Sequence, residues 1–158
     1  MKQSPQMQRI QENMRPGVIT LEGFLGNDDR NLADILEEDN AAVRRLNLSH
    51  EAIARRMEDL KHEGLKGLGD FINVEPHFEV KVESVRGKLP CPFEHPGVFP
   101  KTNITCNNLK TGKTIMYTDM HIHLIGTHGF YEGKGSLYRL EPEDLAETLE
   151  ISVIDNSY

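Results

Sequence analysis

Three side chains that metal ions favour, Asp119, His121 and His123, alternate with apolar residues on a segment that we expect to be a C-terminal strand. On a strand, side chains two positions apart lie on the same face, with Cα atoms about 6.5 to 7 Å apart. Two imidazoles at that separation can hold one Zn²⁺, Ni²⁺ or Fe²⁺ ion. His128 follows Gly126, where a bend would bring it back as a third ligand. Asp119 would then be a fourth ligand or would orient an imidazole.

The residues 119–123, Asp-Met-His-Ile-His, resemble the first-strand motif of the metal-dependent amidohydrolases. In that family the motif stands near the start of a barrel of roughly 250 residues or more. Here about 35 residues follow His123, too few for the remaining strands and ligands, so we do not extend the family's activity to this chain. The competing interpretation is that the two strand histidines line a solvent-facing sheet or bond to one another and to Asp119.

A second candidate is the pair Cys91 and His95, which stand four residues apart in a proline-rich stretch. A thiol and an imidazole at this spacing suit a nucleophile and its base in a small thiol-dependent enzyme, or a pair of metal ligands. A catalytic cysteine also needs a third, orienting group, which the spacing does not reveal. The alternative is a packed thiol beside a surface histidine. Cys106 shares the parity of Ile104 and is expected in the core.

The stretch 126–136 combines glycines, aromatic rings, a lysine and hydroxyl groups. It suits a loop that grips a polar or anionic small ligand through backbone N–H groups and side chains. The residues that we assign to such a ligand site are Gly129, Tyr131, Lys134 and Ser136. The pattern is not a phosphate-binding Walker loop, and its glycines are equally suited to ordinary turns. Because this loop follows the histidines directly, any site would be shared by both.

The residues 48–57 loosely resemble the second and third helices of helix-turn-helix proteins, which implies a regulatory or protein-interaction module. The basic residues near this segment are Arg44, Arg45, Arg55, Arg56 and Lys61. The acidic residues among them are Glu51, Glu58, Asp59 and Glu63, which partly cancel a basic patch. The formal net charge of −7 also repels phosphate backbones, so nucleic acid is not the expected partner. A solvated, salt-bridged helix face is the simpler interpretation.

The elements that must position these residues begin with a helix, because apolar residues at spacings of three, four and seven predict one over residues 30–45. A second helix is predicted over residues 50–63, with Ser49 as its N-cap. The short link between them makes a helical hairpin, within a helical part assigned to residues 17–65. Residues 1–16 are polar and predict a flexible tail or a poorly anchored helix.

The following segments have β character. Residues 77–85 alternate between apolar and charged side chains, as in a half-buried strand. Four prolines within residues 89–100 predict an ordered loop. Strands over residues 102–108 and 114–125 flank Leu109-Lys110-Thr111-Gly112, which suits a hairpin turn, and are expected to pair antiparallel.

These elements predict an α+β fold in which the N-terminal helical hairpin packs on a mainly antiparallel β-sheet, followed by a short C-terminal helix. We assign residues 17–158 to a single domain, with a β part over 71–140. The C-terminal part, residues 141–158, should hold a helix that begins near Pro142 and a short strand over residues 151–154.

Composition limits the class of protein. A content of 37% hydrophobic and 27% charged residues in 158 is that of a globular domain able to fold without staples. Two cysteines are too few for a secreted disulfide framework, and no apolar run suits a membrane span or secretion signal, so we expect a soluble cytoplasmic protein. The sequence leaves open the reaction, the ligand, the biological partner and whether the chain forms a homo-oligomer.

Overall fold

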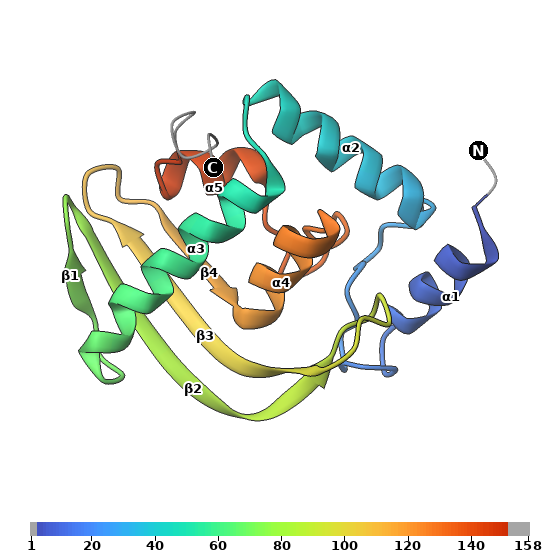
Figure 1. The fold of residues 1–158 in the computed structure, drawn as a ribbon, viewed down its shortest axis with the longest axis horizontal. Helices are drawn as coiled ribbons and strands as arrows, with labels where there is room; N and C mark the ends of the chain where they lie inside the picture. Colours follow the sequence, from blue (N-terminus) through green and yellow to red (C-terminus); the bar gives the residue numbers. More distant parts are fainter. Residues whose placement is uncertain (1–2, 152–158) are drawn as a thin grey trace.

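The computed structural model describes residues 3–151, which form an α+β fold (Figure 1). Within this range the helices are α1 (Pro5–Asn13), α2 (Leu32–Arg45), α3 (His50–Gly64), the 3₁₀ turn η1 (Leu65–Gly67), α4 (Asp119–His128) and α5 (Pro142–Thr148). The strands are β1 (Ile72–Val74), β2 (Phe78–Pro90), β3 (Val98–Asn108) and β4 (Thr114–Thr118). They form an antiparallel sheet in the order β1-β2-β3-β4. The predicted class, N-terminal helices before an antiparallel sheet and a short C-terminal helix, is confirmed.

Helix α3 lies across the sheet and forms one wall of the main hydrophobic core. Its predicted N-cap is confirmed, because the Ser49 hydroxyl accepts a hydrogen bond from the Ala52 N–H at 3.1 Å. Gly64 stands where helix and sheet approach most closely, since a Cβ there would lie 2.5 Å from Cγ1 of Val80. Helix α2 has its main contacts with α1 and α5 instead, so only one helix of the predicted hairpin packs on the sheet.

Strands β2 and β3 form a long, bent hairpin whose far end reaches α1 (Figure 1). Their pairing shifts register around Gly87, which has a φ of 114° that glycine adopts at no steric cost. The predicted loop over residues 89–100 is shorter than expected, because β2 continues to Pro90 and β3 resumes at Val98. The remaining loop, residues 91–97, is called the hairpin loop below. The bend carries it to the side of the molecule where α1 and α4 lie.

Residues 119–128 form helix α4, so the strand predicted over 114–125 is wrong beyond Thr118. Thr118 and His121 form a capping box: the Thr118 hydroxyl accepts from the His121 N–H at 3.3 Å, and the Thr118 N–H donates to Nδ1 of His121 at 3.0 Å. Gly129 ends the helix in the left-handed conformation, with φ of 64°. The buried residues of α4 are Asp119, Met120, His121, Leu124 and Ile125. Burial on several sides of a short helix hides its helical period, and the apolar residues then mimic a strand.

Helix α1 occupies the segment for which the sequence predicts a flexible tail or a poorly anchored helix. The Gln11 side chain accepts from the Leu32 N–H at 3.0 Å and donates to the Arg30 carbonyl at 2.9 Å, which fixes α1 to the start of α2. Ile10 is buried in a second hydrophobic cluster, which joins α1, α2, α4 and the hairpin loop. The members of this cluster are Ile10, Met14, Phe24, Leu32, Ile35, Cys91, Met120, Leu124 and Phe130.

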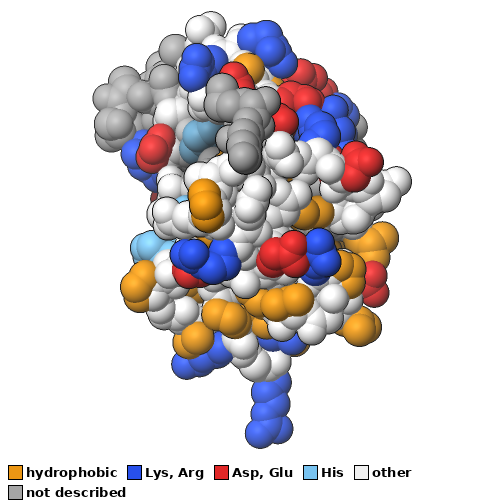
Figure 2. All heavy atoms as spheres, turned by 90° about the vertical axis from the view of Figure 1, so that its right-hand side faces the viewer, with side chains coloured by type: hydrophobic (Ala, Val, Ile, Leu, Met, Phe, Trp, Pro, Cys, Tyr) orange, Lys and Arg blue, Asp and Glu red, His pale blue; other side chains and the backbone are white. Residues whose placement is uncertain are grey.

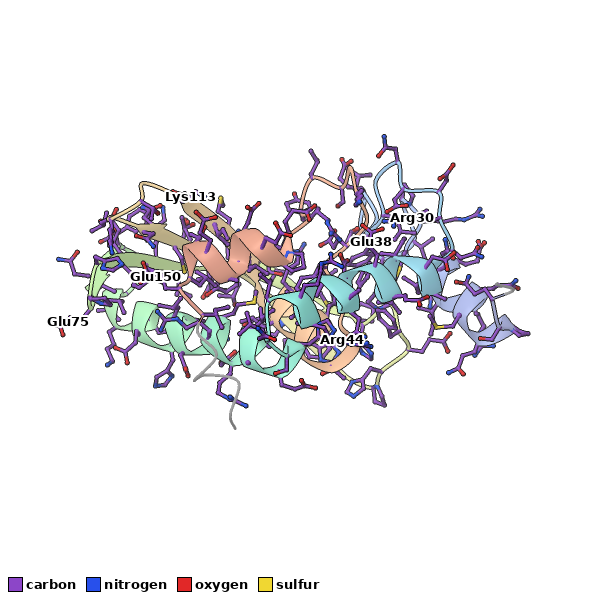
Figure 3. All side chains as sticks on the ribbon, turned by 90° about the horizontal axis from the view of Figure 1, so that it is seen from above. Arg30, Glu38, Arg44, Glu75, Lys113 and Glu150 are labelled. Carbon is purple, nitrogen blue, oxygen red and sulfur yellow. The ribbon has the colours of Figure 1, made fainter. Side chains whose placement is uncertain are left out.

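The chain between α4 and α5 is irregular and runs back past the start of α2. Arg30 and Glu38, labelled in Figure 3, form an ion pair at this place, and Lys134 pairs with the same glutamate at 2.7 Å. The predicted strand over residues 151–154 lies outside the described residues apart from its first position. Among the described residues no helix combines the length and the apolar character that a membrane crossing requires.

Candidate metal centre

The helical form of residues 119–128 separates the histidines that a strand would have held together. Residues two positions apart in an α-helix are separated by about 200° around the helix axis. His121 and His123 therefore face opposite sides of α4. His121 is buried, and both of its ring nitrogens have partners: Nδ1 accepts from Thr118, and Nε2 lies 2.6 Å from Oε2 of Glu132. This side chain therefore has no nitrogen left for a metal ion.

Asp119 is not part of a cluster with His123, because its carboxylate pairs with α3. One oxygen of its carboxylate, Oδ1, pairs with Nζ of Lys61 at 2.5 Å, and its side chain is only 9% exposed. Its second oxygen, Oδ2, is buried without a hydrogen-bond partner among the described residues. Of the four predicted metal ligands, the structure thus brings together His123 and His128 and leaves His121 and Asp119 elsewhere.

Cys91 of the hairpin loop completes a cluster with these two histidines. Its Sγ lies 3.5 Å from Nε2 of His128, and the ligand atoms of Cys91, His123 and His128 all lie within 4.8 Å of one another. On a tetrahedral zinc ion, with Zn–S near 2.3 Å and Zn–N near 2.0 Å, sulfur and nitrogen lie about 3.5 Å apart. The distance between Cys91 and His128 therefore matches that of two ligands on one zinc ion.

A tight turn holds Cys91 in place. The Glu94 N–H donates to the Cys91 carbonyl at 3.1 Å, and Glu94 has the left-handed φ of 63°. The backbone N–H groups of Phe93 and His95 donate to the Cys91 sulfur, an arrangement that favours the thiolate. Helix α1 also binds this turn, since the Asn13 side chain donates a hydrogen bond to the Pro92 carbonyl at 3.0 Å.

One ring nitrogen of His123 is buried in the cluster without a hydrogen-bond partner among the described residues. This nitrogen is Nε2, whereas Nδ1 lies 3.4 Å from the Thr127 hydroxyl. A buried nitrogen without a partner is unfavourable by roughly 1–3 kcal/mol, and a metal ion is one group that satisfies it. The Thr127 hydroxyl is placed to accept a hydrogen bond from a protonated Nδ1, which would leave Nε2 as the ligand.

Two aromatic rings flank the cluster and shape its walls. Phe93 stacks on His128 with ring centroids 4.2 Å apart, and Phe99 stacks on His123 at 4.1 Å. His95, the remaining histidine of the hairpin loop, lies on the exposed rim, with its ring centroid 4.9 Å from that of His123. The sequence motif Cys91-x₃-His95 is thus joined in space to His123 and His128.

The charge states of the cluster follow from its burial. Burial, together with His123 and His95, lowers the pKa of His128 to about 4. Burial and the neighbouring His95 also lower the pKa of His123. Burial raises the pKa of the Cys91 thiol. At neutral pH the two imidazoles are therefore uncharged, as a metal ligand must be, and the thiol still carries its proton.

The residues predicted to bind a small ligand are dispersed along the irregular chain after α4. Gly129 lines a cavity of about 420 Å³, whose other lining residues are Leu36, Glu37, Asn40, His50, Glu51, Gly126, Thr127 and His128. The Tyr131 hydroxyl is bonded to Nδ1 of His50 at 2.8 Å. Lys134 is paired with Glu38, and the Ser136 hydroxyl donates to Glu132 at 2.8 Å. The cavity adjoins the Cys91, His123 and His128 cluster, because His128 belongs to both.

Part of the predicted basic surface of α3 is engaged within the fold. Arg56 donates from Nε to the Leu149 carbonyl at 2.9 Å and lies over the ring of Phe78. On the face that Figure 2 shows, Lys and Arg side chains are interspersed with Asp and Glu. The described residues on that face therefore form no continuous basic patch.

Comparison of the chain with models of known families, with curated proteins and with solved structures returned no match.

The sequence contains signals for the two separate halves of this cluster. Thr118 as N-cap and Gly129 as C-cap indicate a helix over the intervening residues. A helix that ends in His123-x₄-His128, combined with Cys91-x₃-His95, has the ligand spacing of structural zinc sites. The long-range contact between the two motifs depends on the bend of the β2–β3 hairpin, which no local pattern predicts.

Proposed function

We propose that this protein binds a transition-metal ion, most favourably Zn²⁺, through Sγ of Cys91 and one imidazole nitrogen each of His123 and His128. The observation that carries the proposal is the buried, unpartnered Nε2 of His123, a residue that has a ring nitrogen within 4.8 Å of the ligand atoms of Cys91 and His128. The ion would join the hairpin loop to the end of α4.

The ligand types select the metal. A thiolate with two imidazoles suits Zn²⁺, and the same set accommodates Ni²⁺, Fe²⁺ or Co²⁺ with lower preference. Hard ions such as Mg²⁺ and Ca²⁺ prefer oxygen ligands, which this cluster lacks. Zinc binding requires that Cys91 lose its proton to solvent, so uptake of one ion should release close to one proton.

The direct test is elemental analysis of the full chain purified without a histidine tag. We expect close to one zinc ion per chain, or one after zinc is added to chelator-treated protein. Zinc should be lost in Cys91→Ala and in His123→Ala. The matched control is His62→Ala, which removes an exposed histidine of α3 outside the cluster and should leave the zinc content unchanged. Circular dichroism would verify that each variant is folded.

A measurement on the unaltered protein makes the test independent of folding defects. In ¹⁵N-edited NMR spectra of the histidine side chains, zinc should shift Nε2 of His123 and leave both nitrogens of His121 unchanged. Wild-type protein that carries no metal, and binds none in a titration near neutral pH, would contradict the proposal.

A second candidate function is a thiol-dependent enzyme, because Cys91 and His128 are in contact. Two observations count against this function. Cys91 is only 4% exposed, so a substrate would not reach its sulfur. The Cys91 thiol and the His128 imidazole are also both uncharged at neutral pH, so the thiol is not activated as a nucleophile. We expect metal-free protein to react with iodoacetamide more slowly than a free model thiol. Labelling faster than the model thiol would favour the enzyme instead.

A further inference from the structure

We infer that His95 is the fourth ligand of this metal centre, so that the ion is held in a closed Cys-His₃ sphere with no position open to substrate or water. This inference rests on the proposed function, and it assigns the site a structural role in place of a catalytic one.

The spacing of the three imidazole rings supports the assignment. Imidazoles bound to one tetrahedral ion, with Zn–N bonds of about 2.0 Å, have ring centroids about 5 Å apart. The centroids of His123 and His128 are 5.1 Å apart, those of His95 and His123 4.9 Å, and those of His95 and His128 5.8 Å. All three pairs also have tilted or perpendicular planes, at 84°, 50° and 77°. The three separations are close to those of rings that surround one common ion.

His95 also stands at the right place along the chain. The turn that begins at Cys91 directs the backbone N–H of His95 toward the Cys91 sulfur, so both residues belong to one tight unit. In structural zinc sites, a turn supplies two ligands two to four residues apart and a helix end supplies two more. Here the pairs are Cys91-x₃-His95 and His123-x₄-His128.

The exposure of His95 explains why it is the outermost member. The other three ligand atoms already form a group within 4.8 Å, and only the His95 side chain is exposed. An exposed side chain changes rotamer at small energetic cost, so a bound ion can draw the ring inward. Closure would place the ion between the hairpin loop and α4 and shield it from solvent.

Cobalt(II) provides the test, because its visible absorption reports coordination number and its near-ultraviolet absorption reports bonding to sulfur. The experiment titrates Co²⁺ into metal-free wild type, His95→Gly and the control His62→Ala, and then adds imidazole to each. We expect wild type and His62→Ala to give intense four-coordinate spectra that imidazole leaves unchanged. His95→Gly should bind Co²⁺ at least roughly tenfold more weakly, and added imidazole should restore the wild-type spectrum.

The outcomes separate the two proposals. If wild type binds no Co²⁺ and no Zn²⁺, the metal centre itself is refuted. If wild type shows the sulfur-to-cobalt band but His95→Gly has the same affinity and spectrum, the centre stands and His95 is not a ligand. A wild-type spectrum that changes on addition of imidazole or azide would likewise overturn the closed sphere, because it would reveal an exchangeable fourth position.

Discussion

At the scale of single residues, Asp28 shows how a short loop is held by one carboxylate. Its oxygens accept hydrogen bonds from the backbone and side chain of Arg30 at 2.7 to 3.3 Å and from the Lys134 N–H at 3.0 Å. The Arg30 side chain is the main cause that lowers the pKa of Asp28 from 3.8 to about 2. The carboxylate therefore stabilises the folded state wherever it is ionised.

This network predicts a pH-dependent effect of Asp28→Asn. Because the folded-state pKa is depressed, the stabilisation is complete above the unfolded-state pKa near 4 and is lost as pH falls through about 2. We expect the variant to be less stable than wild type by about 2 kcal/mol at pH 7, with the difference shrinking as the pH falls below 4. Urea unfolding at a series of pH values measures this, and a difference that does not change with pH would contradict the assignment.

His121 provides a residue-scale test that distinguishes the proposed Cys91, His123 and His128 site from the predicted strand site. His121→Gln keeps a donor near Glu132 but leaves that buried carboxylate less well paired, so we expect a loss of about 1–3 kcal/mol in stability. The zinc content should remain that of wild type, because His121 is not a ligand. Loss of zinc from a variant that is still folded would indicate that His121 is a metal ligand after all.

At the scale of elements, α4 is positioned by its close approach to α3. A Cβ on Gly126 would lie 2.9 Å from the Cβ of Ala54, closer than two methyl groups tolerate. We expect Gly126→Val to destabilise the fold by about 1–3 kcal/mol and to weaken zinc binding, because α4 carries two of the ligands. The change Ala54→Gly in the same chain should restore part of both losses. Absence of any rescue would show that the two helices do not meet at this point.

The sequence predicts an element well where capping residues mark its ends and the spacing of apolar residues shows its type. Helix α3 was predicted to span residues 50–63 and spans His50–Gly64, because Ser49 is a strong N-cap and one face alone is apolar. Helix α4 was predicted as a strand, because burial on several sides gives it apolar residues at alternate positions. Capping outweighs alternation here, since Thr118 and Gly129 satisfy the helix ends and the strand would leave them without a role.

Local patterns likewise predicted only part of the candidate site. His123 and His128 were correctly grouped near one another, but His121 was grouped with them through a strand parity that the helix removes. Cys91 and His95 were recognised as a pair and could not be linked to the other histidines. The contacts span the bent hairpin, and Cys91 and His128 are 37 positions apart in the sequence. Tertiary geometry of this kind is not encoded in any short window.

At the scale of the whole molecule, a metal ion should act as a crosslink between the hairpin loop and α4. Ligand binding to the folded state alone adds about 2.7 kcal/mol when the free ion is at 100 times its dissociation constant. For a chain of this size that corresponds to a rise of about 5–10 °C in the thermal midpoint. Calorimetry with and without zinc should show this rise in wild type and none in His123→Ala. An equal rise in both would mean that the stabilising ion binds elsewhere.

The buried ion pair between Asp39 and Arg139 bears on how the chain folds while it is being synthesised. Arg139 grips the carboxylate with two hydrogen bonds of 2.6 and 2.8 Å, yet the partners are 100 positions apart in the sequence. A ribosome that adds about 5–20 residues per second takes roughly 5–20 seconds to cover that interval. During this time Asp39 has no Arg139 to pair with, and the apolar face of α2 lacks the C-terminal partners against which it packs in the folded chain. We therefore expect nascent chains that end before Arg139 to be degraded by added protease, and chains that extend through α5 to resist it.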